Sequence, residues 1–144
     1  MNIKFKKLND AAIVPSYQSD GAAGMDIHSI EDAVIYARGV KLVKTGLVAE
    51  IPDGYEIQVR PRSGLAAKHG VTVLNAPGTI DSDYRGEIGV ILINHSPDEI
   101  PFTVKAGDRI AQLVVAKVEH ADVEEVTSVT STERGGGGFG STGK

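Results

Sequence analysis

Residues 55–60, YEIQVR, alternate apolar and polar side chains with a period of two. This is the period of a β-strand that buries one face and leaves the other in solvent. Residues 87–94, EIGVILIN, are instead almost continuously apolar and rich in β-branched side chains, which is typical of a strand buried on both faces. The two stretches predict a fold built mainly from β-strands.

Shorter stretches on both sides have the same character. Residues 100–104 alternate again, although Pro101 places them at a sheet edge or at the start of a strand. Turn-forming Gly, Pro and Asp residues separate the stretches at short intervals, which is typical of a sandwich or jelly roll. We therefore expect an all-β, jelly-roll-like barrel or sandwich. Its further strands are predicted at residues 3–7, 25–27, 33–36, 40–44, 47–50, 71–73 and 108–115.

The composition agrees with an ordinary globular domain, since 41% of the 144 residues are hydrophobic and 24% are charged. The chain has no cysteine, which excludes disulfides, thiolate chemistry and Cys-type zinc sites. The net charge is -4 and no basic stripe is present, so we expect no nucleic-acid partner, although a small phosphorylated ligand would fit. No apolar stretch has the length of a signal peptide or a membrane span, so we expect a cytoplasmic protein without membrane contact.

The last part of the chain has a different composition. From Thr127 to Lys144 it consists mainly of Ser, Thr and Gly, so it cannot bury enough apolar surface to fold alone. A disordered tail is the ordinary interpretation of such a segment. Arg134, which can bind an anion, and Phe139, which can stack on a ring, also fit a flap that becomes ordered on a ligand. We divide the chain accordingly into a domain, residues 1–126, and a flexible tail, residues 127–144.

One short helix is expected at residues 64–69, with Ser63 as its N-cap and Gly70 as its C-terminal cap. Amides at a helix start lack intrahelical partners and suit a phosphate, and the Arg62 guanidinium adds a permanent cation. A plain capped helix with a solvated arginine explains the same residues.

Residues 75–86, NAPGTIDSDYRG, are the most unusual stretch of the chain. The first half looks like a hairpin that carries Asn75. Asp81 has the chemistry to hold and deprotonate a water, and Tyr84 has the ring to stack on a sugar. An Asx-type turn with ordinary surface acids is the alternative.

Two other segments carry polar groups within apolar surroundings. Asp26 stands at the start of an apolar segment, and Gln112 lies inside the apolar run 108–115, where it needs hydrogen-bond partners if it is buried. The pair Asp108-Arg109 is most often structural. The Gly-rich end, residues 138–144, imitates a P-loop, but no strand precedes it and no helix follows, so we reject that interpretation.

Taken in order and spacing, these stretches resemble the five motifs of the homotrimeric dUTP pyrophosphatase (dUTPase) family. The resemblance implies a dUTPase-like β-clip subunit, a homotrimer with sites shared between subunits, and Mg²⁺-dependent hydrolysis of dUTP to dUMP and pyrophosphate. Such an activity keeps uracil out of DNA and supplies dUMP for dTMP synthesis. The matching segments are residues 23–27, 61–66, 75–86, 107–112 and 134–143.

The resemblance also implies a role for each matching residue. Asp81 would be the general base that activates the water attacking the α-phosphorus, and Asp26 would reach the metal through a bound water. Asn75 would bind the uracil edge, and Tyr84 would pack on the deoxyribose. The complete set of expected substrate-binding residues is Arg62, Ser63, Gly64, Asn75, Gly78, Thr79, Ile80, Tyr84, Gln112, Arg134, Phe139, Gly140, Ser141 and Thr142.

Within that set, different subunits would supply different parts of the ligand's surroundings. Residues 62–64 would bind the phosphates from a second subunit, with Gln112 in the polar shell around them. The tail of a third subunit would place Phe139 over the uracil and Arg134 on the γ-phosphate.

Two alternatives accompany this interpretation. A dCTP deaminase shares the fold in the wider superfamily, but Tyr84 and Phe139 look like the hydrolase pattern. A non-catalytic module that binds dUTP and a protein partner is the other alternative, and Asp81 argues against it.

Overall fold

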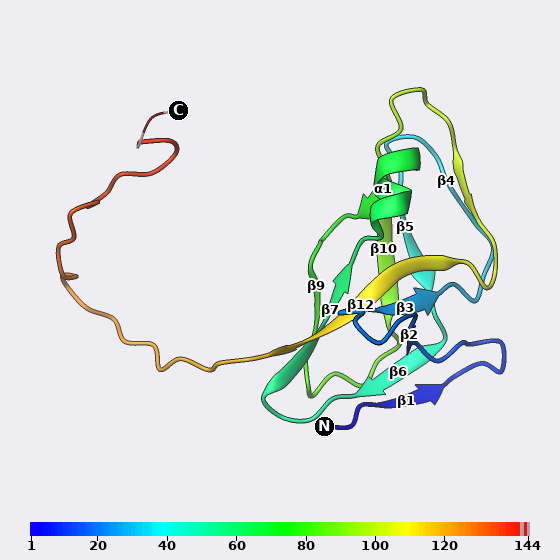
Figure 1. Ribbon diagram of the computed structural model, residues 1–144, viewed down its shortest axis with the longest axis horizontal. Helices are drawn as coiled ribbons and strands as arrows, with labels where there is room; N and C mark the ends of the chain where they lie inside the picture. Colours follow the sequence, from blue (N-terminus) through cyan, green and yellow to red (C-terminus); the bar gives the residue numbers. More distant parts are fainter. Residues whose placement is uncertain (142, 144) are drawn as a thin grey trace.

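The computed structural model describes residues 1–141 and 143, and it confirms a fold made mostly of β-strands with one short helix among these residues (Figure 1). The helix is α1 (Ser63–His69). The strands are β1 (Lys4–Lys7), β2 (Ser16–Tyr17), β3 (Met25–His28), β4 (Ala33–Ile35), β5 (Val40–Lys44), β6 (Leu47–Glu50), β7 (Tyr55–Arg60), β8 (Val71–Val73), β9 (Gly78–Ile80), β10 (Gly89–Asn94), β11 (Phe102–Val104) and β12 (Arg109–Lys117).

The strands form antiparallel sheets in which no neighbours except β2 and β3 are consecutive in the described part of the chain. The largest is five-stranded, in the order β2-β3-β12-β7-β9, and a three-stranded sheet has the order β5-β10-β8. The pairs β1-β6 and β11-β4 complete the arrangement. Strand β12 therefore lies between β3 and β7. This arrangement places three segments that are far apart along the chain side by side. The described sheets do not close into a barrel, so the sandwich-like form of the expected fold is the one present.

The core is aliphatic. The alternation of β7 is confirmed, because Ile57 and Val59 are buried while Arg60 is exposed. Strand β10 is buried or half-buried along its whole length, as its continuous apolar run predicts. The largest fully buried side chains are those of Ile27, Ile35, Val43, Leu47, Ile57, Val71, Ile88, Val90, Leu92, Val104, Ile110 and Leu113.

Asn94 is a buried polar residue that joins three segments. It ends β10 and is fully buried. Its Nδ2 donates to the carbonyl of Ile35 at 3.0 Å and to that of Ile100 at 2.8 Å, while its Oδ1 accepts from the amide of Ser96 at 2.8 Å. One side chain thus satisfies backbone groups of β4, of the loop after β10 and of the segment before β11.

Most predicted strands are confirmed, several of them with their bounds: residues 40–44, 47–50, 55–60 and 71–73. Strand β2 was not expected. The hairpin predicted around Asn75 is wrong in its pairing, because β8 pairs with β10 whereas β9 pairs with β7. The chain crosses from one sheet to the other at this turn, and local turn residues carry no information about that choice of partner.

The helix begins one residue earlier than expected, and its N-cap prediction is wrong. Ser63 is the first helical residue, and Arg62 occupies the N-cap position without a side-chain capping hydrogen bond. The predicted C-terminal cap is confirmed, since Gly70 has φ of 64° and its amide donates to the carbonyl of Ala66 at 3.1 Å. A left-handed φ at this position is the reason that a glycine ends the helix.

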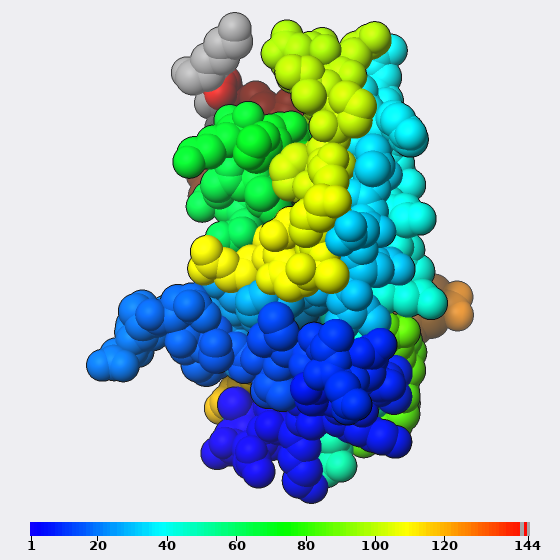
Figure 2. Space-filling model, turned by 90° about the vertical axis from the view of Figure 1, so that its right-hand side faces the viewer, coloured from blue at the N-terminus to red at the C-terminus, as the bar shows by residue number. Residues whose placement is uncertain are grey.

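The chain leaves the body after β12. The amide of Val118 donates to the carbonyl of Gly54 at 3.0 Å, and the following residues then run away from the sheets towards the C-terminus (Figure 1). Figure 2 shows the N-terminal residues in blue at one end of the body and α1 in green near the other. The described part of the chain contains no helix that is long and apolar enough to cross a membrane.

We expect Asn94→Ala to lower the free energy of unfolding by about 3 kcal/mol, because each buried partner left without a hydrogen bond costs roughly 1–3 kcal/mol. Chemical denaturation followed by circular dichroism measures the change. Asn2→Ala, at an exposed position, is the matched control and should leave stability unchanged. Equal stability of the two variants would contradict a role for Asn94 in joining β4, β10 and β11.

Candidate functional site

Asp26 lies at the centre of a cluster that contains two arginines. Its carboxylate is mostly buried, with 14% of the side chain exposed, and its Oδ2 lies 3.1 Å from Nη1 of Arg109. Its Oδ1 lies 3.6 Å from Nε of Arg62. Arg62 also donates from Nη1 to the carbonyl of Arg109 at 2.8 Å. The cluster carries one excess positive charge, which suits an anionic ligand.

Arg109 was not expected in this cluster. The sequence predicts that Asp108 and Arg109 form a structural pair, whereas in the structure Asp108 accepts a hydrogen bond from the amide of Lys105 and Arg109 pairs with Asp26. Only the pairing of β3 with β12 brings Arg109 and Asp26 together. No spacing within the sequence could have indicated it, because the two residues are far apart along the chain.

His28 follows Asp26 by two residues on β3, so both side chains are on one face of the strand. Its Nδ1 is buried and has no hydrogen-bond partner among the residues that the structure describes. Burial lowers the pKa of His28, the Asp26 carboxylate opposes that change, and the Arg109 and Arg62 guanidinium groups add to the lowering. At neutral pH the imidazole is therefore uncharged, and the positive charge of the cluster comes from the arginines alone.

A second group of expected residues surrounds a cavity of about 140 Å³ beside β9. Tyr84 lines it, and its hydroxyl donates to the carbonyl of Glu87 at 3.1 Å. A Cβ atom at position 86 would overlap the phenol ring, so Gly86 leaves the space that the ring occupies. The expected substrate-binding residues that line this cavity are Asn75, Gly78, Thr79, Ile80 and Tyr84.

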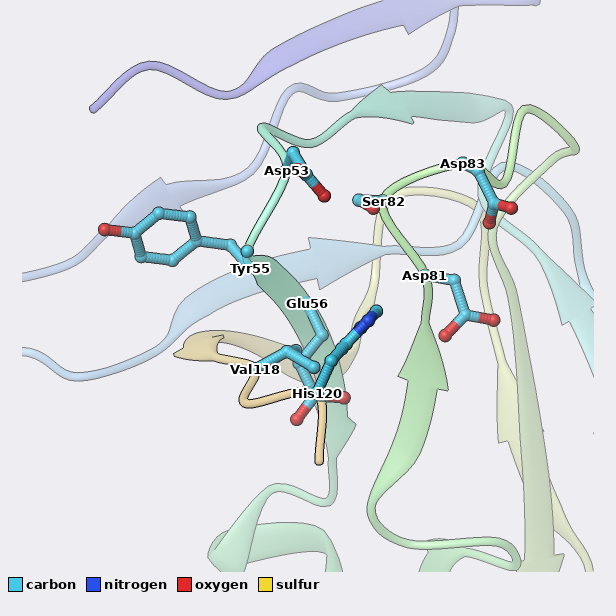
Figure 3. A pocket seen from close by; sticks show the side chains of 9 residues that line it. Asp53, Tyr55, Glu56, Asp81, Ser82, Asp83, Val118 and His120 are labelled. Carbon is cyan, nitrogen blue, oxygen red and sulfur yellow. The ribbon is translucent and has the colours of Figure 1, made fainter. Parts of the chain in front are cut away.

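Asp81 is one of the residues that line a different cavity, of about 310 Å³, shown in Figure 3. It directly follows β9, whose Ile80 pairs with Ile57 of β7. Asp53, Glu56, Asp83 and His120 line the same cavity. Within the described residues, no group of three or more potential ligands is arranged to hold a metal ion.

The expected site residues are therefore divided within one chain. The cavities at Tyr84 and Asp81 have no lining residue in common, and neither contains Asp26, Arg62, Ser63 or Gly64. Gln112 lies beside the Asp26 cluster, where its Nε2 donates to the carbonyl of Pro61 at 2.9 Å.

The tail residues lie apart from all three groups. Arg134 donates from Nε to the carbonyl of Gly137 at 2.8 Å, and Phe139 is fully exposed. Gly140 and Ser141 are exposed too, whereas Thr142 lies outside the described residues. A single chain in this form does not bring the tail to the residues that it is expected to accompany (Figure 1).

Comparisons with known proteins agree with these observations. A protein-family model described as dUTPase matches residues 10–143. The deoxyuridine 5'-triphosphate nucleotidohydrolase of Nautilia profundicola is 60% identical over 144 residues, covering 100% of both chains. The protein of the same name from Picosynechococcus sp. is 58% identical over 143 residues, covering 99% of each chain.

Solved structures show the same fold. The dUTPase of Staphylococcus bacteriophage 80alpha, in a structure with dUPNHPP, matches with a TM-score of 0.90 and 27% identity over 99% of each chain. Because the family model spans nearly the whole sequence and full-length relatives share more than half of its residues, the chain belongs to the dUTPase family.

Proposed function

We propose that this protein is a dUTP diphosphatase, which hydrolyses dUTP to dUMP and pyrophosphate. The observation that carries the proposal is the match of the dUTPase family model to residues 10–143. Relatives that are 52–60% identical bear the name deoxyuridine 5'-triphosphate nucleotidohydrolase. A cytoplasmic location is part of the proposal, since deoxynucleoside triphosphates are made there.

The cavity beside β9 suits the nucleoside part of the substrate. Its mixed lining of Asn75, backbone groups and the Tyr84 ring suits a planar base joined to a sugar. An amide side chain can both donate to and accept from the edge of uracil. The Tyr84 ring, held through its hydroxyl by the Glu87 carbonyl, would pack on the deoxyribose and leave no room for a 2′-hydroxyl.

Asp81 is proposed as the general base. It would accept the proton of a water whose oxygen attacks the α-phosphorus. The bond from that phosphorus to the oxygen bridging it to the β-phosphorus would then break, and pyrophosphate would leave. Asp53, Glu56 and Asp83 line the same cavity as Asp81.

The Asp26 cluster is proposed as the place for the phosphates. Arg62 would bind phosphate oxygens together with Ser63 and Gly64, and Gln112 lies at the edge of the cluster. Mg²⁺ commonly binds through one or two carboxylates plus substrate phosphates and water, so a single Asp26 that reaches it through water fits this ion. The ion would offset the charge of the triphosphate.

The division of these residues within one chain supports a homotrimer with shared sites. Val40 and Leu42 of β5, together with Leu74 directly after β8, are apolar residues with about half of their surface exposed: 53%, 57% and 50% respectively. Apolar faces of this kind mark surfaces that another subunit covers. Residues 127–144 would then be the flap that closes over a neighbouring subunit's site, and residues 1–126 the domain that forms it.

The first test is release of pyrophosphate from dUTP, dTTP, dCTP and UTP, with Mg²⁺ and with chelator. Release from dUTP alone, lost with chelator, supports both the reaction and the recognition of base and sugar. Release of ammonia from dCTP would favour a deaminase instead. Binding of dUTP without turnover in Mg²⁺ would contradict the enzyme proposal.

We expect Asp81→Asn to lower kcat by about 1,000-fold, because the amide cannot accept the proton of the water. Affinity for the imido analogue of dUTP should change little, and isothermal titration measures it. Asp53→Asn, in the same cavity, is the matched control and should retain most of the turnover. Loss of binding in Asp81→Asn would show instead that this carboxylate is structural.

Deletion of residues 133–144 should lower kcat/KM on the order of 100-fold, because without the flap the phosphates are less well oriented and water is less well excluded. The assembly should remain trimeric in analytical ultracentrifugation. Unchanged kinetics would contradict the flap, and loss of the trimer would show that these residues hold subunits together.

A further inference from the structure

We infer that Glu87 and Thr45 are positioning residues for Tyr84, and that through them the turn between β5 and β6 increases the discrimination of deoxyribose from ribose. The inference rests on the proposed function, in which the Tyr84 ring packs on the deoxyribose. Glu87 and Thr45 act on the peptide group that holds the Tyr84 hydroxyl and are not assigned a contact with the sugar.

Tyr84 lies in a segment whose shape is not set by regular secondary structure. Residues 81–88, between β9 and β10, belong to no helix or strand. The tyrosine is about half exposed, and its hydroxyl donates to the carbonyl of Glu87 at 3.1 Å. Among the described residues this is the one hydrogen bond of the Tyr84 side chain. The position of the ring therefore follows the position of the Glu87 carbonyl.

The peptide group that contains this carbonyl is held by the turn between β5 and β6. The N–H of the same peptide group, from Ile88, donates to the carbonyl of Leu47 at 2.8 Å. On one side of it, Oε1 of Glu87 accepts from the amide of Gly46 at 2.8 Å. On the other side, the buried hydroxyl of Thr45 donates to the carbonyl of Ile88 at 2.6 Å. Because a peptide group is planar, these three contacts together fix the direction of the Glu87 carbonyl.

Gly46 makes this turn a firm support. It is buried and has φ of 68°, a left-handed conformation that favours glycine. Its carbonyl accepts from the amide of Leu8 at 2.8 Å. A Cβ atom at this position would lie 3.0 Å from that of Ala12 and 3.2 Å from two carbons of Ile30, so the turn is closely packed. A buried amide needs a hydrogen-bond partner, and the side chain of Glu87 supplies it.

The same residues border the space proposed for the nucleoside. Tyr84, Glu87 and Ile88 all line the cavity beside β9. A ring held in place blocks the position of a 2′-hydroxyl. The two sugars differ by one oxygen atom, so a small displacement of the ring is enough to admit the larger sugar. Loosening the peptide group should therefore impair discrimination between the sugars more than it impairs hydrolysis of dUTP.

The experiment measures the ratio of kcat/KM for dUTP to kcat/KM for UTP in the parent protein and its variants. This ratio is independent of the fraction of protein that is folded, so a loss of stability alone leaves it unchanged. In Glu87→Leu the ratio should fall about tenfold, a change equivalent to about 1.4 kcal/mol and within the range of one hydrogen bond. Glu87→Gln retains an acceptor oxygen and should keep the parent ratio.

Glu31→Leu is the matched control. Oε1 of Glu31 accepts from the amide of Lys44 at 3.0 Å, beside the same turn, and Glu31 is half-buried like Glu87. Among the described residues no hydrogen bond joins Glu31 to residues 81–88. The control should lose stability and keep the parent ratio. An equal fall of the ratio in both leucine variants, or an unchanged ratio in Glu87→Leu, would overturn the inference.

Further variants test the route through the Tyr84 hydroxyl and the role of Thr45. In a Tyr84→Phe background, which lacks the hydroxyl, Glu87→Leu should change the ratio less than about twofold, because the two groups act as one unit. Thr45→Val should lower the ratio, whereas Thr45→Ser, which keeps a hydroxyl, should not. Independent, multiplying effects of the first pair would overturn the inference, as would equal ratios in the two Thr45 variants. The Thr45 variants remain informative if Glu87→Leu fails to fold.

A measurement without substrate distinguishes failure of the inference from failure of the proposed function. Should the parent protein not hydrolyse dUTP, the proposed function fails, and NMR of protein labelled in its tyrosine rings then tests the positioning role. The hydroxyl of Thr45 is bonded to Ile88 and not to the ring, yet Thr45→Val should shift the Tyr84 ring resonances. Thr45→Ser and Glu31→Leu should leave them in place. Unchanged Tyr84 resonances in Thr45→Val would overturn the inference.

Discussion

The pairing of β12 with β3 on one side and β7 on the other builds both the core of the largest sheet and the arginine cluster. It joins β12 to β3, whose residues lie more than 80 positions earlier in the chain, and to β7, whose residues lie more than 50 positions earlier. The register places Gln112 opposite both Asp26 and Arg60. The buried side chains of this sheet, Ile27, Ile57 and Leu113 among them, stabilise the pairing through apolar burial. The polar cluster of Asp26, Arg62 and Arg109 forms on the same strands, so the stability of the core and the geometry of the site have a common origin.

The fold places the candidate site residues in three separate groups. Strand β9 and the turn before it shape the small cavity at Tyr84, Asp81 stands just beyond the same strand in an acidic cavity, and the arginine cluster lies across the sheet. A nucleoside triphosphate is long, and its base, phosphates and reacting atom need different chemical surroundings. Our proposal that several subunits contribute to one site explains why a single chain holds these surroundings on separate surfaces.

The sequence was sufficient to predict much of the fold. The alternation of residues 55–60 predicts a strand buried on one face, and the apolar run of residues 87–94 predicts a strand buried on both faces. Both predictions are confirmed. The errors concern groups whose environment depends on distant residues. Ser63 has the chemistry of an N-cap, but the chain enters the helix so that Arg62 takes that position. The turn at Asn75 has the residues of a hairpin, yet its two strands join different sheets.

Local periodicity, turn chemistry and the order of residues along the chain are enough to predict the β-rich class of the fold, the position of the short helix and the motifs of the family. Which side chains meet depends instead on how the strands pack. The ion pair of Arg109 with Asp26, the hydrogen bond from Gln112 to Pro61 and that from the Gly46 amide to Glu87 all join segments that are distant along the chain. The physical reason is that strand pairing is non-local: a strand's own residues specify which face is buried, whereas its partner and register are selected by the packing of the whole core.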